Sequence, residues 1–192
     1  MAARKVEIIQ KAHACITIVA IDLCPALSVM VEDGLINHKP RSFNDGDPEG
    51  NVLVFIASQD EDLNRRVSSL AQDAVIPVNV IDRLELCTFI MPAIIDRSPI
   101  VIGITSGGDA PIIARALKER LETLIPAGLG RLAKFAGSCR DRVKEVIPEG
   151  PLRLRFWEGF MDGPIAEYIF AGNEKAAGSL FEENLILAKK GK

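Results

Sequence analysis

Asp82 is the residue of this chain best placed to do chemistry. It comes directly after the apolar run Ile76 to Ile81, which is typical of a buried parallel strand. Ligands of open α/β sheets bind at the carboxyl ends of strands, so a carboxylate at this position could accept a proton from a ligand. An Asp after a strand is also a common turn or helix-capping residue, and position alone leaves both interpretations open.

A second feature lies about 25 residues further along the chain. The apolar strand Ile100 to Thr105 ends at Ser106-Gly107-Gly108, and a helix with Pro111 in its first turn follows. Backbone N–H groups at such a helix start can converge on an anion. Glycines there also fit a tight turn with positive φ, without any ligand. A carboxylate and an anion cradle together favour chemistry on a polyanionic substrate.

Strands and helices alternate through the first half of the chain, which predicts an α/β fold with a parallel sheet. Beyond residue 91 we expect one further strand, and beyond 105 only helices. The expected helices are 2–14, 22–31, 60–73 and 129–147, and the expected strands are 15–20, 34–38, 52–57, 76–81 and 100–105.

The helix over 129–147 carries apolar residues at alternating spacings of three and four. They are Leu129, Leu132, Ala136, Cys139, Val143 and Val146. This pattern fits a coiled-coil-like seam between two chains and equally an intramolecular packing stripe. The segment 129–157 is also rich in Lys and Arg, which fits either a solvated face or a positive rim for an anionic ligand.

Composition narrows the classes of function. A net charge of −3 and a single Trp and Tyr give no indication of a nucleic-acid partner, and no apolar run is long enough to span a membrane. The four cysteines are scattered, which favours free thiols in a reducing cytoplasm. His13 and His38 lack ligand spacing, so we expect no preformed metal site.

Four segments resemble one known family. They are Ala3-Arg4-Lys5, Val54 to Asn64, Asn79 to Pro111 and the sequence FWEGF at 156–160, and the run from Phe89 to Pro111 is the most specific. They are similar to the bifunctional precorrin-2 dehydrogenase / sirohydrochlorin ferrochelatase family, which includes the N-terminal half of siroheme synthase. The resemblance covers nearly the whole chain.

The resemblance implies three regions and a homodimer. Residues 1–91 would form a Rossmann-like NAD-binding domain, 92–127 a strand-helix region for dimerisation and substrate, and 128–192 an all-helical domain. The reaction would oxidise precorrin-2 to sirohydrochlorin with NAD⁺ and then insert Fe²⁺ to give siroheme. Iron would arrive as a substrate at the macrocycle itself.

The family also assigns roles to individual residues. Asp82 would be the general base, and Asn79 would line the same cleft. Ser106, Gly107 and Gly108 would bind the substrate's propionate and acetate groups, and Ser106 aligns with a serine that can be phosphorylated. Ile21, Asp22 and Ser58 would contact NAD, although Ser58-Gln59 replaces a Thr-Asp pair of the family pattern.

One departure from the family concerns the start of the chain. In the family pattern a strand ending in three glycines precedes Ala3-Arg4-Lys5, and here Met1 occupies that place. That strand is central in the order 3-2-1-4, so its absence predicts a gap between two halves of the sheet. We expect the true start to lie upstream, the alternative being a divergent or truncated relative.

Two further functional hypotheses follow from this departure. The protein could be a chelatase alone, or a non-catalytic tetrapyrrole-binding protein that has lost NAD binding with the glycine-rich loop. It could also be a gene fragment that folds poorly, which cooperative thermal unfolding would argue against.

Overall fold

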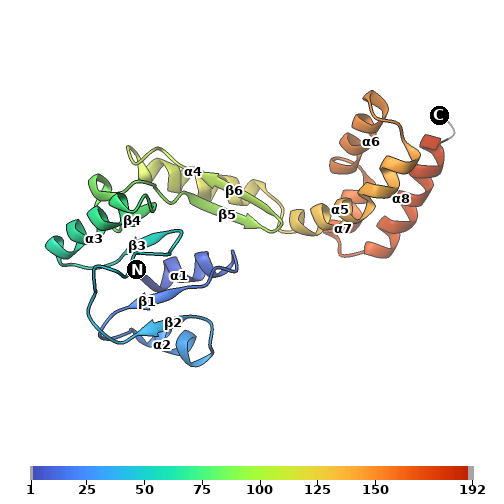
Figure 1. The fold of residues 1–192 in the computed structure, drawn as a ribbon. Helices are drawn as coiled ribbons and strands as arrows, with labels where there is room; N and C mark the ends of the chain where they lie inside the picture. The colour runs from blue at the N-terminus through green and yellow to red at the C-terminus, as the bar shows by residue number, and fades with distance from the viewer. Residues whose placement is uncertain (1, 190–192) are drawn as a thin grey trace. The chain divides into compact units, whose positions relative to one another are not determined.

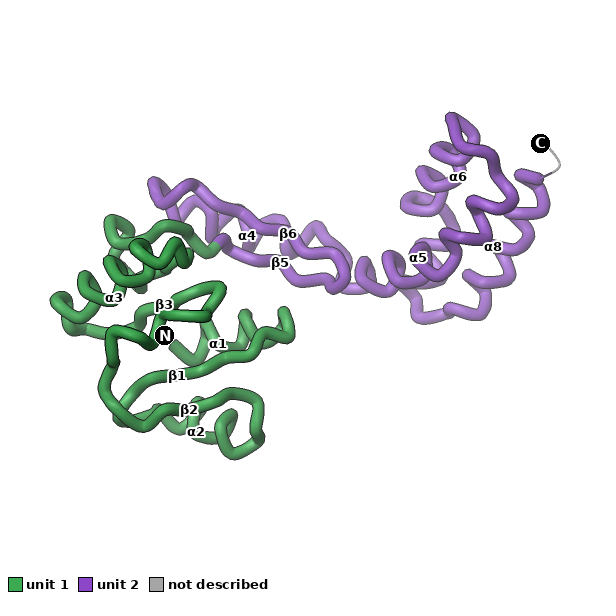
Figure 2. Tube along the Cα trace, viewed as in Figure 1, with its two compact units in different colours: residues 1–91 green, residues 92–192 purple. Residues whose placement is uncertain are grey.

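The computed structural model describes residues 2–189, so the position of Met1 lies outside the described part. The chain forms two compact units, Met1–Met91 and Pro92–Lys192 (Figure 2). Among the described helices, none is long and apolar enough to cross a membrane.

The first unit alternates helices and short strands. Its elements are α1 (Ala2–Gln10), β1 (Thr17–Val19), α2 (Pro25–Glu32), β2 (Asn37–Lys39), β3 (Val54–Ile56), α3 (Glu61–Asp73), β4 (Val78–Val80) and the 3₁₀ helix η1 (Leu84–Leu86). Every helix and strand expected here is present. Each strand is shorter than the segment that predicted it, because only the residues that pair with a neighbouring strand form β-structure.

The strands of this unit form two separate parallel sheets instead of one. β1 pairs with β2, from Thr17 opposite Asn37 onward, and β3 pairs with β4, from Val54 opposite Val78 onward (Figure 1). Within residues 2–189 no strand joins β1 to β3. This confirms the predicted gap between two halves of a Rossmann-like sheet.

Each half-sheet has its own small core. One joins α1, α2 and the segment before β2 through Val6, Leu27 and Ile36. The other lies between α3 and the β3–β4 pair, and its buried residues are Ile56, Val67, Ala71, Ile76, Val78 and Val80.

The second unit begins with an antiparallel hairpin that the sequence analysis did not predict in full. β5 (Ala93–Arg97) pairs with β6 (Ile100–Ile104), and α4 (Pro111–Leu124) follows. Only β6 was expected. The polar pair Asp96-Arg97 breaks the apolar pattern of β5, and their side chains hydrogen-bond at the hairpin turn and to α4.

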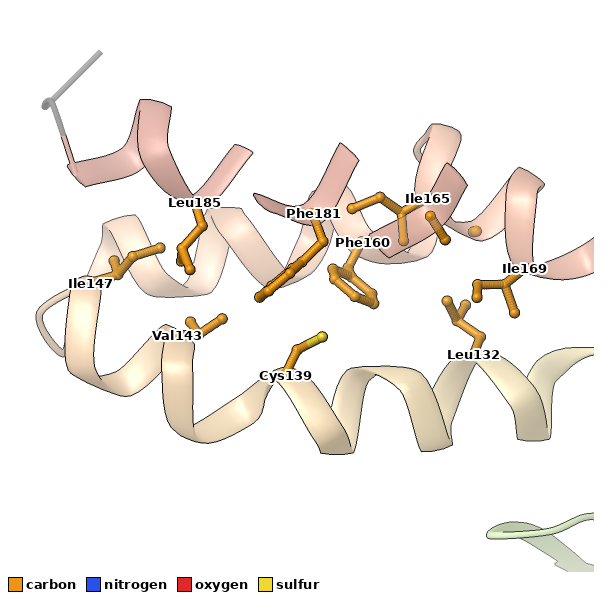
Figure 3. Close-up of a cluster of buried hydrophobic side chains, with 11 residues drawn as sticks. Leu132, Cys139, Val143, Ile147, Phe160, Ile165, Ile169, Phe181 and Leu185 are labelled. Atoms are coloured by element: carbon orange, nitrogen blue, oxygen red, sulfur yellow. The ribbon is translucent and has the colours of Figure 1, made fainter. Parts of the chain in front are cut away.

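Four helices complete the second unit around one core. They are α5 (Leu129–Val146), α6 (Pro151–Met161), α7 (Pro164–Phe170) and α8 (Glu174–Lys189). The apolar seam of α5 packs inside the unit: Leu132, Cys139 and Val143 face Phe160, Ile169 and Phe181 (Figure 3). Of the two interpretations of this seam, the structure therefore shows the intramolecular stripe.

Candidate active site

A pocket of about 220 Å³ opens where β3 and β4 end. It is lined by the residues that follow the two strands and by one residue of α3, namely Ser58, Gln59, Asn64, Ile81, Asp82 and Arg83. Two of the sequence-predicted site residues, Ser58 and Asp82, thus lie in the same pocket. Both stand at the carboxyl ends of parallel strands, as predicted.

Asp82 is exposed and has a left-handed backbone, with φ at 60°. Asp tolerates this conformation better than most residues, because its short polar side chain can bond locally. The backbone is held on both sides: Ile81 donates its N–H to Ile56 at 3.0 Å, and Arg83 donates to Val80 at 3.4 Å. The turn therefore presents the carboxylate to solvent at the mouth of the pocket.

The opposite wall is a turn that starts helix α3. The Ser58 hydroxyl accepts a hydrogen bond from the Asp60 N–H at 3.0 Å, and Asp60 caps the helix by accepting from the Leu63 N–H at 3.0 Å. These two hydrogen bonds explain Ser58 and Asp60 as parts of the turn that begins α3, without any ligand. The Ser58 side chain keeps hydrogen-bonding capacity for a ligand, since a hydroxyl can also donate.

Asn64 is a residue of this site that the sequence analysis missed. It is only 3% exposed, and its amide group donates to the Ser58 carbonyl at 3.1 Å, which fixes the turn. Its Oδ1 has no partner among the described residues. The inward face of α3 carries Asn64, Val67, Ser68 and Ala71. A polar residue spaced at helical intervals with apolar residues is the sequence pattern that could have predicted a buried role for Asn64.

A charged pair closes the edge of the pocket. Arg83 forms an ion pair with Glu61 in the first turn of α3, and both side chains are about half exposed. This pair ties the turn after β4 to the start of α3. Among the described residues, the recorded ion pair of Arg83 is with Glu61 and not with Asp82.

Asn79 lies in β4, two residues before Ile81, and is not among the residues that line the pocket. It is 7% exposed, and its amide donates to the Phe89 carbonyl at 3.0 Å and to Cys87 Sγ at 3.7 Å. These bonds hold the segment after η1 against β4. Contact between Asn79 and substrate stays a prediction.

The two remaining predicted NAD contacts follow the other half-sheet. Ile21 and Asp22 lie in the bend directly after β1, and both side chains are exposed. The Asp22 carboxylate is therefore available to accept hydrogen bonds from a ribose hydroxyl, as the dinucleotide-binding pattern requires. Its role also stays a prediction.

The Ser-Gly-Gly turn lies in the second unit, between β6 and α4. Gly107 and Gly108 have φ of 68° and 100°, which only glycine adopts readily. The Ser106 hydroxyl accepts from the Ala110 N–H at 2.9 Å, and the Gly107 N–H donates to the Thr105 hydroxyl at 3.1 Å. Among the described residues, the backbone N–H groups of Ser106 and Gly108 in this turn have no protein acceptor.

The histidines do not form a site in the described part of the chain. His38 contacts the Ala20 carbonyl at 2.8 Å, beside the β1–β2 pair. Within residues 2–189 no three His, Cys, Asp or Glu side chains are grouped so that they could hold a metal ion.

In a comparison with known proteins, the first unit and part of the second unit match two different family models. Residues 1–93 match a model for NAD(P) binding, and residues 128–185 match the sirohaem synthase dimerisation region. The siroheme synthase of Thioalkalivibrio sulfidiphilus is 47% identical over 185 residues, which is 96% of this chain. That of Methylobacillus flagellatus is 45% identical over the same share.

This chain is similar to siroheme synthases over 96% of its own length. The resemblance inferred from sequence is thereby confirmed. The chain spans 38% and 40% of the length of these two relatives.

A solved structure supports the fold of this chain. "SirC, precorrin-2 dehydrogenase" superposes with a TM-score of 0.70 at 18% identity, over 95% of this chain and 89% of that one. At this identity the likeness shows the fold alone, and it confirms a Rossmann-like domain followed by a strand-helix region and further helices.

The residues present fit an NAD dinucleotide in part. Asp22 is exposed for a ribose, and Ser58 stands beside the pocket. The pyrophosphate of a dinucleotide needs a glycine turn ahead of the first helix. The described residues begin inside α1, so they do not include such a turn.

Proposed function

We propose that this protein acts on the tetrapyrrole substrates of siroheme biosynthesis, with Asp82 as the proton acceptor. The observation that carries the proposal is the exposed Asp82 carboxylate at the mouth of a pocket, in a chain that is 42–47% identical to siroheme synthases over 96% of its length. The activity of those longer relatives is part of this proposal.

Both halves of the family reaction require a base near the macrocycle. Oxidation of precorrin-2 removes a hydride and a proton, and insertion of Fe²⁺ into sirohydrochlorin releases two pyrrole N–H protons. Asp82 can accept a proton in either step and pass it to solvent, because its side chain is exposed. Fe²⁺ is a substrate in this scheme.

NAD, when bound, supplies the acceptor for the hydride. Asp22 and the backbone at Ile21 would hold its adenosine ribose, and Ser58 would contact the dinucleotide beside the Asp82 pocket. The match to an NAD(P)-binding family model supports this assignment.

The turn Ser106-Gly107-Gly108 would bind a carboxylate of the tetrapyrrole. The amide of Gly108 can donate to such a group, since within the described part of the chain it has no protein acceptor. The Ser106 hydroxyl keeps a donor for the same group or for a phosphate, because it only accepts from Ala110.

The second unit would form a homodimer. The match to the sirohaem synthase dimerisation region supports this, and so do exposed apolar side chains of α4 and β6, namely Ile112, Ile113, Leu124 and Val101. The dimer is expected in the cytoplasm. Sedimentation at micromolar concentration should give twice the monomer mass, and a monomer alone would contradict it.

Chelation without dehydrogenation is the second candidate function. It requires a proton acceptor, which the exposed Asp82 can supply, and no hydride acceptor. Titration with NAD⁺ distinguishes the two. Binding supports the bifunctional enzyme, and no binding with intact Fe²⁺ insertion supports the chelatase.

The proposal is tested by replacing Asp82 with Asn, which keeps its size and removes the base. We expect the rate of Fe²⁺ insertion into sirohydrochlorin to fall about 10²- to 10⁴-fold. The matched control is Asp73→Asn, an exposed aspartate at the end of α3, which should leave the rate unchanged. An Asp82→Asn protein as active as the original would refute the proposed base.

A further inference from the structure

Lys5 has an unusual environment in the first unit. It lies on α1, but its side chain reaches across to the β3–β4 half of the unit. Its Nζ is 3.4 Å from Met91 Sδ and 5.9 Å from the centre of the Phe55 ring. Phe55 belongs to β3, the strand that leads into the pocket with Asp82.

The ammonium group of Lys5 lacks a carboxylate partner among residues 2–189. Its contacts there are a thioether sulfur, which is a weak acceptor, and the face of an aromatic ring. The side chain is half-buried. A partly desolvated cation with such partners gains free energy when an oxyanion binds to it.

The electrostatics of the site agree with this geometry. Burial lowers the pKa of Lys5, and the charges of Cys87 and Asp82 oppose that effect while Arg4 adds to it. Phe55, whose ring Lys5 contacts, lies opposite Asn79 in the β3–β4 pair, three residues before Asp82. A ligand at Asp82 would therefore come within reach of the lysine.

We propose that Lys5 binds a peripheral carboxylate of the tetrapyrrole substrate and so orients the macrocycle against Asp82. This inference rests on the proposed function, which supplies a ligand that carries propionate and acetate groups. Lys5 would be a binding residue, while proton transfer stays with Asp82. The aromatic face of Phe55 would keep the ammonium in place before substrate arrives.

The test compares three variants by titration with sirohydrochlorin, followed by absorbance. Lys5→Met keeps an unbranched side chain over Phe55 and removes the charge, while Lys5→Arg keeps the charge. Lys11→Met removes an exposed lysine just after α1 and is the matched control. We expect the dissociation constant to rise about tenfold in Lys5→Met and to change less than threefold in the other two.

A second titration, with NAD⁺, separates the two oxyanions that a lysine could bind. We expect Lys5→Met to leave NAD⁺ affinity unchanged. Weaker NAD⁺ binding with unchanged sirohydrochlorin binding would assign the lysine to a dinucleotide phosphate and overturn the proposal. Equal sirohydrochlorin affinity in all variants would also overturn it.

Failure of this inference can be told apart from failure of the proposed function. If the original protein binds no sirohydrochlorin, the proposed function fails and the role of Lys5 fails with it. If the original protein binds and Lys5→Met binds equally well, only the role of Lys5 fails. Should Lys5→Met melt at a lower temperature than the original, Lys5→Arg decides: a weakened arginine variant would overturn the proposal.

Discussion

The two units of this protein reach a stable interior in different ways. In the first unit the buried apolar residues of the described chain form two clusters, of six and three residues, one for each half-sheet. In the second unit, eleven buried residues from α5 to α8 form one continuous cluster (Figure 3). The Asp82 pocket lies in the unit with the divided core, and the Ser106-Gly107-Gly108 turn lies in the other unit.

The two units differ because helices and strands bury their surfaces through different kinds of contact. Antiparallel helices joined by short loops bury their faces against sequence neighbours. In the first unit each parallel sheet has two strands, so β1 and β3 each pair on one edge only within residues 2–189. Open strand edges leave backbone groups to solvent, so the first unit should be the less stable of the two.

The largest effect is expected from Phe181→Ala in the helical core. Phe181 is 3% exposed and contacts the rings of Phe135, Phe156 and Phe160. Its truncation should lower the free energy of unfolding by about 3–5 kcal/mol. Trp157 packs in the same ring cluster and is the only Trp of the chain, so its fluorescence during urea denaturation reports on this unit.

The same experiment tests whether the two units unfold separately. Amide exchange in α3 should be unchanged by Phe181→Ala. A uniform loss of amide protection in both units would show that they unfold as one cooperative structure. It would contradict the different stabilities expected for the two units.

A smaller effect is expected from Leu27→Ala in the three-residue cluster of the first unit. Leu27 is 4% exposed, and its buried neighbours are Val6 and Ile36. The cost should be about 2 kcal/mol, the lower end for buried leucines, because a small cluster can collapse around the cavity. Hydrogen exchange of α1 and α2 measures it, and a loss as large as that from Phe181→Ala would refute the ranking.

The smallest effect concerns a carboxylate in the loop between the two half-sheets. Arg41 binds both oxygens of Asp47, at 2.6 and 2.8 Å, and the Asn44 N–H donates to one of them. The Arg41 hydrogen bonds, with smaller contributions from Asn44 and Lys39, hold the pKa of Asp47 well below its ordinary value. Asp47→Asn should therefore cost the first unit about 1 kcal/mol at neutral pH.

The pH dependence of this contribution has a definite sign. Because the folded pKa of Asp47 is depressed, the stabilisation is complete above the unfolded pKa of about 4 and is lost as the pH falls below it. Stability of the original protein should therefore drop more steeply below about pH 4 than that of Asp47→Asn. Asp45→Asn is the control: Asp45 pairs with Arg66 in solvent and should change stability by less than 0.5 kcal/mol.

Local patterns in the sequence were sufficient for much of the fold and part of the site. An apolar run followed by a carboxylate predicted β4 and Asp82, and the structure has both at the edge of a pocket. The glycines at 107 and 108 were expected in a tight turn and have positive φ. Even the gap between the half-sheets followed from an expected strand order.

Other features depend on contacts between residues far apart in the chain, and sequence patterns do not specify these. The seam of α5 had two interpretations until α6, α7 and α8 were seen to cover it. Strand β5 was missed because its polar residues are satisfied by a turn and by α4. Asn64 and Lys5 were also missed, since their partners lie 6 to 86 residues away.

The sequence by itself therefore determined the order of the elements, the resemblance to siroheme synthases and the carboxylate at the strand end, because each depends on local patterns of polarity and spacing. Only the tertiary structure decided which residues surround that carboxylate. The ammonium of Lys5 and the side-chain amide of Asn64 become parts of a site through their distances to other elements. Packing sets those distances.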